Sequence, residues 1–324
     1  MNAVEVATAA PRRFRMRLET VRANAVWVAV ALALLAGLIF TPSTVAPDQL
    51  AVIARQAAPL GMLALGQAVL LIGRQFDLSV GGVVALVNVV AAGSFAQENG
   101  AVAAILLCLA IGLVVGLING VGVAYGRVDP FVMTLGAAFV LTGAVLIYTD
   151  GAPSGQIPEG IRDLSSTRLL GVSLSVFIWV GAGAALALAL ARTRVGREIY
   201  ARGVNPEAAR LAGVRTRAIE VGSFAFSGLC AAAGGLLLAG FVGTGTLGAG
   251  QDLLLQSLAA VVVGGITFEG GRGNVLGSVG GAFLLTLIGA LLTGVGLGNA
   301  GDLIIGGLVL AAAAALFQKQ SGRT

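Results

Sequence analysis

The residue types that usually carry chemistry are scarce in this sequence. None of its 324 residues is a histidine, which excludes histidine proton relays, histidine metal sites and a Ser-His-Asp triad. Lys319 is the only lysine, and no Gly-rich loop of the GxxxxGK[ST] type precedes it, so the chain is not a P-loop ATPase. The sequence has neither paired carboxylates nor a nucleophile motif of the kind that an intramembrane enzyme would need. We therefore expect no catalytic residue, no metal site and no bound cofactor on this chain.

The carboxylates lie where ion coupling would not place them. A proton- or sodium-coupled carrier usually needs a carboxylate, or the carbonyls of a broken helix, near the membrane midplane. The acidic residues next to apolar segments all fall at segment ends: Asp77, Asp129, Asp252, Glu269 and Asp302. This pattern disfavours a standalone ion-coupled secondary transporter or channel, which remains the alternative because sodium sites can be built from carbonyls.

Three side-chain amides, Gln67, Asn88 and Asn119, lie inside apolar segments in the first half of the chain. Their donors and acceptors suit a hydroxylated solute, although buried amides also join helices to one another. A path with amides and without charges fits a neutral polar solute. We therefore predict that at least one of the three lines the substrate path, with the region of Gln256 as the next candidate.

The composition requires that these residues be positioned by membrane helices. Only 11% of the residues are charged and the mean hydropathy is +0.95, whereas a soluble domain carries about 25% charged residues. Apolar runs close to the 20 residues of a spanning helix recur along the chain. They predict an all-α, polytopic transmembrane helical bundle of about ten spanning helices, at residues 24–41, 50–72, 78–96, 101–124, 129–148, 172–191, 218–242, 253–268, 274–296 and 300–317.

Small residues are expected at the contacts between these helices. Gly112, Gly116 and Gly120 recur at every fourth position and would line one helix face, where they allow close packing. Cys108 and Cys230 lie inside apolar runs and are predicted to be small core residues.

The basic residues predict the orientation. If the N-terminus is cytoplasmic and the segments alternate, every lysine and arginine except Arg55, Arg162 and Arg168 falls on the cytoplasmic side. We therefore expect both termini in the cytoplasm. The sequence pI of about 10 then reflects membrane topology and not binding to nucleic acid.

The basic loop between 192 and 217 contains signals for a short helix. Asn205 suits an N-cap, Pro206 the first helical position, Glu207 the first turn and Gly213 the position after the C-cap. The helix Pro206–Ala212 is too short to persist alone, so a partner protein or the rest of the chain must hold it. Small residues at Ala208, Ala209 and Ala212 would allow close approach to a groove, with Glu207 and Arg210 pairing with partner charges beside Leu211. The alternative is a helix lying at the lipid headgroups.

Taken in order, four stretches resemble the permease subunits of ribose-type ABC importers. They are Phe76-Asp77-Leu78-Ser79-Val80-Gly81, then Gly126-Arg127-Val128-Asp129-Pro130-Phe131, then the loop from Gly196 to Gly213, and finally Ala259-Ala260-Val261-Val262-Val263-Gly264-Gly265 with Gly270-Gly271-Arg272-Gly273. Together with the flanking helices they cover nearly the whole chain. The order of the four stretches is more specific than any one of them.

The resemblance implies a multi-pass protein of the bacterial inner membrane that translocates a sugar or sugar-like solute. It implies a second permease chain, identical or paralogous, a cytoplasmic ABC ATPase that binds ATP and Mg, and an extracytoplasmic substrate-binding protein. The chain would then divide into a basic cytoplasmic segment 1–23, a permease domain 24–317 with the coupling loop 192–217, and a cytoplasmic tail 318–324. Residues Asn205 to Gly213 would contact the ATPase.

Overall fold

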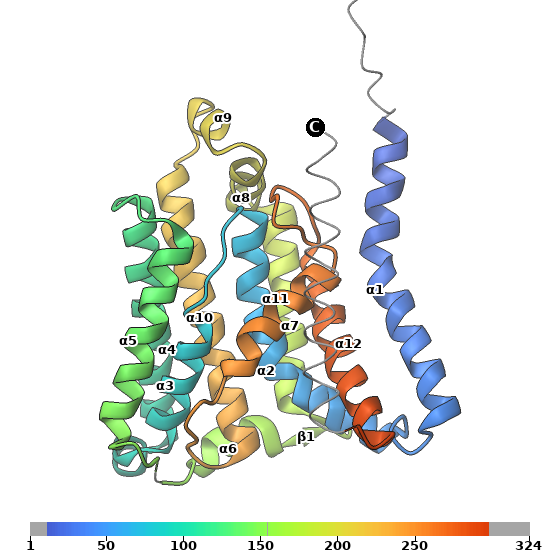
Figure 1. Cartoon of the computed structure of the whole chain (residues 1–324), viewed down its shortest axis with the longest axis vertical. Helices are drawn as coiled ribbons and strands as arrows, with labels where there is room; N and C mark the ends of the chain where they lie inside the picture. Colours follow the sequence, from blue (N-terminus) through green and yellow to red (C-terminus); the bar gives the residue numbers. More distant parts are fainter. Residues whose placement is uncertain (1–11, 154, 298–324) are drawn as a thin grey trace, which may run out of the picture.

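The computed structural model of the chain describes residues 12–153 and 155–297 (Figure 1). Residues 1–11 of the basic N-terminal segment, the last predicted segment 300–317 and the tail 318–324 lie outside the described residues.

The described part is built from helices, as predicted, with one two-stranded pairing between them. β1 (Arg168–Leu169) and β2 (Val172–Ser173) run antiparallel, with Arg168 opposite Ser173. The helices are α1 (Arg12–Phe40), α2 (Pro47–Ile72), α3 (Val80–Ala92), α4 (Ser94–Ala124), α5 (Pro130–Thr149), α6 (Glu159–Ser166), α7 (Leu174–Arg192), α8 (Arg194–Val204), α9 (Pro206–Leu211), α10 (Thr216–Val242), α11 (Gln251–Val263) and α12 (Val275–Gly294).

Six of these helices, α2, α4, α5, α7, α10 and α12, are long and apolar enough to cross a membrane. The chain is therefore an all-α membrane protein, as its composition predicted. Each apolar segment predicted between residues 24 and 296 coincides with one helix. The count of about ten spans stays a prediction, because α3 and α11 have 13 residues each, about 20 Å of helix, against a hydrocarbon core of about 30 Å.

α2 lies at the centre of the bundle and packs against α7, α10, α11 and α12. Every residue from Ala57 to Ile72 is buried, as expected for a central helix that is apolar on all sides. α5, by contrast, buries only Thr134, Leu141 and Val145. The faces of the outer helices are thus left for lipid or for another chain.

The predicted packing role of the α4 glycines is confirmed. Gly112, Gly116 and Gly120 all face α10, and the two backbones are so close that added side chains would collide. A Cβ on Gly112 would meet the carbonyl oxygen of Gly228, and one on Gly116 would meet that of Phe224. Close backbone approach of this kind replaces the hydrophobic drive that lipid cannot supply between helices.

Two helices begin in the interior of the bundle. α2 ends at the same end of the molecule as α8. Residues 73–79 then run from that end back into the bundle without helical structure, and α3 starts there (Figure 1). Residues 243–250 similarly lead from α10 to the start of α11. The two starts lie against each other, since a Cβ on Gly81 would be 3.0 Å from the carbonyl oxygen of Gly250. We call residues 73–79 and 243–250 the two inner links.

The ends of the bundle differ in composition. The beginning of α1 lies at the same end as α8 and α9, whereas α6 and β1 lie at the opposite end (Figure 1). The sequence predicted three basic residues away from the cytoplasmic side. Two of them are Arg162 in α6 and Arg168 in β1. The fold therefore separates the two groups of basic residues as the predicted orientation requires.

Candidate functional site

The helix predicted in the inner loop is present as α9. The Asn205 Oδ1 atom accepts hydrogen bonds from the backbone N–H groups of Glu207 and Ala208, both at 3.0 Å, and Pro206 is the first helical residue. Gly213 follows the helix with a φ of +82°, which favours glycine. The helix ends at Leu211, with Ala212 as its C-cap, one residue before the predicted end.

α9 projects from the bundle at the basic end of the molecule (Figure 1). Its exposed residues are Pro206, Glu207, Ala208, Arg210 and Leu211, flanked by Asn205, Ala212 and Gly213. Ala209 is different: it is buried against its own chain. Of the three small residues expected to face a partner, only Ala208 and Ala212 are therefore available. Leu211 is 77% exposed and is the largest apolar side chain that the helix presents.

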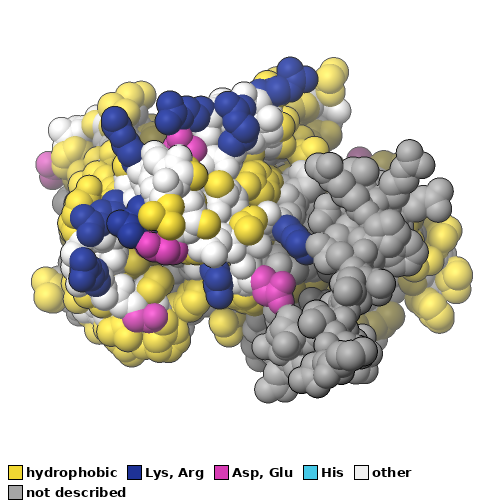
Figure 2. Space-filling model, turned by 90° about the horizontal axis from the view of Figure 1, so that it is seen from above, with side chains coloured by type: hydrophobic (Ala, Val, Ile, Leu, Met, Phe, Trp, Pro, Cys, Tyr) yellow, Lys and Arg dark blue, Asp and Glu magenta, His cyan; other side chains and the backbone are white. Residues whose placement is uncertain are grey.

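The charges of α9 pair with each other. Arg210 Nη2 lies 2.5 Å from Glu207 Oε1 and Arg210 Nε lies 3.1 Å from Glu207 Oε2. The hydrogen bond and charge of Arg210 lower the pKa of the Glu207 carboxyl below its ordinary value. Because both side chains are exposed, this pair contributes little to stability, and its partners can be exchanged on docking. Seen from this end, arginine side chains spread over the surface with acidic and apolar ones between them (Figure 2).

α8 was not predicted from the sequence. Its N-cap is Thr193, whose Oγ1 atom accepts a hydrogen bond from the N–H group of Gly196 at 3.2 Å. The buried positions Ile199, Arg202 and Gly203 follow helical spacing. The threonine cap and this spacing could have predicted α8 from the sequence. The pattern was hard to recognise because Arg202, a charged residue, lies on the buried face of the helix. α8 and α9 together make up most of the coupling loop, and α9 is the part that projects from the bundle (Figure 1).

The interior holds a carboxylate, which corrects the expectation that Asp77 lies at a segment end. Asp77 is in the first inner link and is 1% exposed. Its Oδ1 atom accepts hydrogen bonds from the N–H and hydroxyl groups of Ser79 at 2.8 and 2.6 Å, and its Oδ2 atom accepts one from Ser227 at 3.4 Å. Hydropathy placed Asp77 at a boundary because α2 and α3 are separate apolar runs, whereas the link between them folds inward. Across the described residues, no three His, Cys, Asp or Glu side chains gather into a metal-binding group.

Two of the three predicted path amides belong to this buried cluster. The Gln67 side chain donates to the backbone carbonyl of Asp77 at 2.6 Å and accepts from its N–H group at 3.3 Å. Asn119 donates to the Ser79 hydroxyl at 2.8 Å. Both side chains are fully buried. Their hydrogen bonds hold the first inner link between α2, α4 and α10.

The third amide, Asn88, serves the second inner link. Its Oδ1 atom accepts hydrogen bonds from the N–H group of Thr246 at 2.7 Å and from the Thr246 hydroxyl at 3.4 Å. Asn88 is fully buried in α3. The bond therefore ties the link that precedes α11 to the other interior helix.

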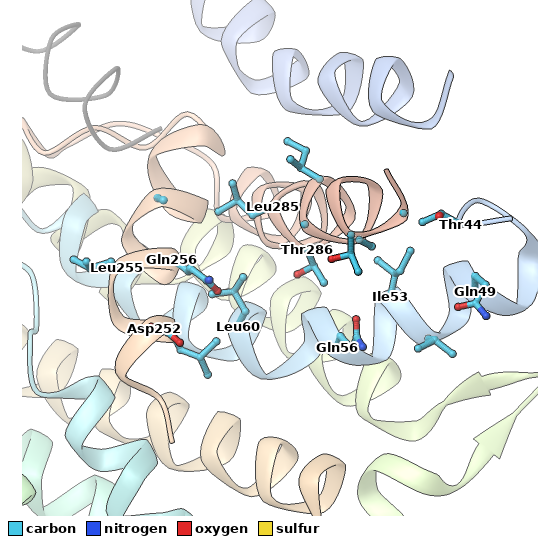
Figure 3. A pocket seen from close by; sticks show the side chains of 18 of the residues that line it. Thr44, Gln49, Ile53, Gln56, Leu60, Asp252, Leu255, Gln256, Leu285 and Thr286 are labelled. Carbon is cyan, nitrogen blue, oxygen red and sulfur yellow. The ribbon is translucent and has the colours of Figure 1, made fainter. Parts of the chain in front are cut away.

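A cavity of about 820 Å³ lies between α2, α11 and α12 (Figure 3). Its volume is in the range of small-molecule sites. Gln67, Asn88 and Asn119 are not among its lining residues, whereas Gln256, the next candidate named above, is. The polar lining side chains are Ser43, Thr44, Gln49, Gln56, Gln251, Asp252, Gln256, Thr286 and Thr293. Gln251 and Asp252 form the first turn of α11, so the cavity reaches the interior start of that helix.

Comparison with known proteins agrees with this architecture. The family described as branched-chain amino acid transport system, permease component, matches residues 49–313. The galactose/methyl galactoside import permease protein MglC of Escherichia coli strain K12 is 36% identical over 310 residues, covering 89% of this chain and 91% of that protein. The autoinducer 2 import system permease protein LsrC of Yersinia pseudotuberculosis strain YPIII is 34% identical over 249 residues, covering 77% and 71%. No solved structure matches.

These matches cover most of the chain and of the relatives, so the chain belongs to this family of transport permeases. It is the membrane permease subunit of an ABC importer in the bacterial inner membrane, as the sequence motifs implied. It is not an enzyme, since the hydrolysis of ATP in such importers belongs to a separate subunit.

The cluster around Asp77 predicts which substitutions the interior tolerates. Asp77→Asn keeps an acceptor for Ser79 and should leave folding and transport near the parental level. Asp77→Leu leaves buried donors without a partner, at about 1–3 kcal/mol each, and should lower the yield of folded protein. Thermal stability in detergent and solute uptake measure the two effects. A folded Asp77→Asn variant without transport would show that the carboxylate charge takes part in transport, as an ion-coupled carrier requires.

Proposed function

We propose that the chain imports a sugar or sugar-like neutral polar solute. Four amides and several hydroxyls line the cavity, and Asp252 is the one charged side chain among the described lining residues. Amides both donate to and accept from hydroxyl groups, which suits a sugar. A free amino acid carries both a positive and a negative charge and needs a partner for each. The name of MglC also gives sugars, galactose and methyl galactoside, as the solutes of that relative.

The partners follow from the family. We infer that two permease chains, identical or paralogous, enclose the path, while a cytoplasmic ATPase binds ATP and Mg and an extracytoplasmic binding protein delivers the solute. Lipid surrounds the bundle, and nucleic acid has no part in the function. Family membership favours this assembly over a standalone ion-coupled carrier.

The observation that carries the proposal is the projecting helix α9. Its six residues are too few for a stable isolated helix, yet Asn205 caps its start and all its side chains except that of Ala209 are exposed. A socket on the ATPase accounts for both facts. The residues from Asn205 to Gly213 are then the ATPase contact, except Ala209, which anchors the helix to its own chain.

We also infer that the three amides of the interior act on the path indirectly. Gln67 and Asn119 hold the first inner link, and Asn88 holds the second. The cavity amides, Gln256 first among them, would contact the solute. About ten spans with both termini cytoplasmic, and the division into segments 1–23, 24–317 and 318–324, complete the proposal.

The orientation is tested by thiol labelling. In a variant with Cys108→Ala and Cys230→Ala, we expect Leu170→Cys, in the β1–β2 turn, to react with a membrane-impermeant reagent on intact spheroplasts. Ala212→Cys, beside α9, should react only after permeabilisation. Both residues are exposed, so access to the reagent depends on the side of the membrane. Reaction of both from the same side would contradict the topology.

The docking role of α9 is tested by Leu211→Asp. A charge at the centre of the contact should weaken binding of the ATPase by about 2 kcal/mol or more, as loss of an interface hot spot does. Leu170→Asp is the matched control, because Leu170 is also an exposed leucine, at 99% against 77% for Leu211, and lies at the opposite end. The measurement is copurification of the ATPase from detergent. If Leu211→Asp retains the ATPase as fully as the control, α9 is a lipid-surface element and the proposal loses its main support.

The solute cavity is tested by Gln256→Leu. Losing a polar contact to the solute should lower uptake about tenfold, since about 1.4 kcal/mol corresponds to a factor of ten. Asn99→Leu, an exposed amide in α4 that bonds only its own helix, is the control. Uptake of labelled sugar is compared at equal amounts of assembled importer. Normal uptake by Gln256→Leu would place the solute path elsewhere.

A further inference from the structure

The C-terminal end of α8 contacts two backbone turns. One turn precedes the interior helix α3 and the other follows the interior helix α11. One turn, residues 72–75, opens the first inner link and leads to α3. The other, residues 270–273, lies in the connection from α11 to α12. They contact each other directly, because the N–H group of Gly271 donates to the carbonyl oxygen of Ile72 at 2.7 Å.

Gly203 of α8 packs directly against the backbone of both turns. A Cβ at this position would collide with the carbonyl oxygen of Ile72 and with the backbone nitrogen of Gly271. One helical turn earlier, the Tyr200 hydroxyl donates to the carbonyl oxygen of Gly273 at 2.8 Å. α8 therefore cannot shift without moving the two turns with it.

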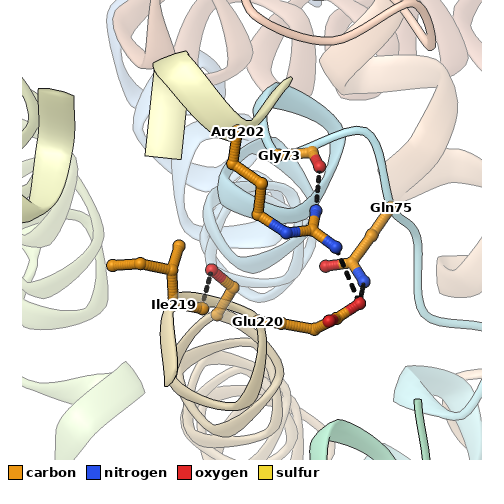
Figure 4. A network of polar contacts seen from close by, with 6 residues as sticks. Gly73, Gln75, Arg202, Ile219 and Glu220 are labelled. Carbon is orange, nitrogen blue, oxygen red and sulfur yellow. Dashed lines mark hydrogen bonds and ion pairs between the residues drawn. The ribbon is translucent and has the colours of Figure 1, made fainter. Parts of the chain in front are cut away.

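Arg202 fixes this contact to α10. Its Nη1 atom donates to the carbonyl oxygen of Gly73, and its Nη2 atom lies 2.7 Å from Glu220 Oε1 (Figure 4). The Gln75 side chain donates to the same Glu220 oxygen. Only 9% and 12% of the Arg202 and Glu220 side chains are exposed, so water screens this pair far less than the exposed pair on α9.

These contacts form one mechanical connection from the loop to the interior. α9 follows α8 after the single residue Asn205. Arg202 is hydrogen-bonded to Gly73 directly and is connected to Gln75 through Glu220. The buried Asp77 lies two residues after Gln75 in the same link. The link ends at Ser79, next to Gly81 and Gly250, where α3 and α11 begin. Gln251 and Asp252 then border the cavity.

We propose that the Arg202–Glu220 ion pair, together with Gly73 and Gln75, transmits the docking of the ATPase at α9 to the two interior helices and so to the solute cavity. We call these four residues the clasp. This inference rests on the proposed function, because it assumes an ATPase at α9. Arg202 and Glu220 touch neither the solute nor the ATPase. They are positioning residues, whose loss uncouples the two ends of the molecule while leaving each in place.

The main test removes both charges together. Arg202→Met with Glu220→Gln leaves no unpaired buried charge and keeps an acceptor for Gln75, so the bundle should assemble. We expect the complex to keep the ATPase and its basal hydrolysis. Stimulation by solute-loaded binding protein should fall about tenfold, a coupling loss typical of linked sites. Arg194→Met with Glu198→Gln removes the other ion pair of α8, which lies away from the turns, and should leave stimulation unchanged.

Arg202→Lys supplies a second readout. Lysine keeps the charge opposite Glu220 but lacks the planar fork that reaches Gly73 at the same time. It should assemble, retain basal hydrolysis and show stimulation between that of the parent and the neutral pair. If the neutral pair does not assemble, Arg202→Lys decides: reduced stimulation supports the clasp and parental stimulation overturns it.

The outcomes separate the two levels of the argument. Parental stimulation in the neutral pair, or an equal loss in the Arg194–Glu198 control, overturns the clasp and leaves the proposed function intact. Failure of the unchanged chain to retain any ATPase would overturn the proposed function itself.

Discussion

The structure depends on keeping non-helical backbone satisfied inside a membrane protein. Lipid offers no hydrogen bonds, so every N–H and C=O group of the two inner links needs a partner within the protein. Side chains of α2 and α3 supply part of them: Gln67 pairs with both backbone groups of Asp77, and Asn88 accepts from the N–H group of Thr246. Asn119 of α4 adds a hydrogen bond to the Ser79 hydroxyl. The burial of Gln67 and Asn88 is thus explained by the backbone groups with which they pair.

This constraint shapes the cavity that we propose as the route of the solute. Because α11 starts in the interior, the cavity is bounded by the first turn of a helix as well as by helix sides. Short helices on non-helical links can shift without breaking a long helix. Transporters with interrupted helices place their substrate sites at such points. α4 and α10, by contrast, are long helices in close backbone contact along the glycine face of α4.

Local signals in the sequence predicted the elements whose causes are local. Asn205, Pro206 and Gly213 specify α9 within nine residues, and the glycines at every fourth position of α4 indicate a packed face before its partner is known. The family motifs gave the class of protein because they span most of the chain. Apolar runs located α1 to α5, α7 and α10 to α12, although run length alone does not distinguish a span from a helix that starts in the interior.

The remaining features depend on contacts between distant residues. Asn88 meets Thr246 across 158 positions, Ser227 meets Asp77 across 150, and Arg202 meets Gly73 across 129. No pattern near Asp77 shows that its link folds inward, and an amide that bonds backbone has the same local sequence as one that bonds solute. The burial of Ala209 likewise depends on how α9 rests on its own chain. These assignments required the three-dimensional structure.

The central claim is that this chain moves solute only as part of an ATP-driven assembly. The direct measurement is uptake of labelled neutral sugar into proteoliposomes containing the purified permease. We predict ATP-dependent uptake only when the ATPase and the loaded binding protein are both present, with no response to imposed proton or sodium gradients. Uptake driven by either gradient in the absence of the ATPase would contradict the account.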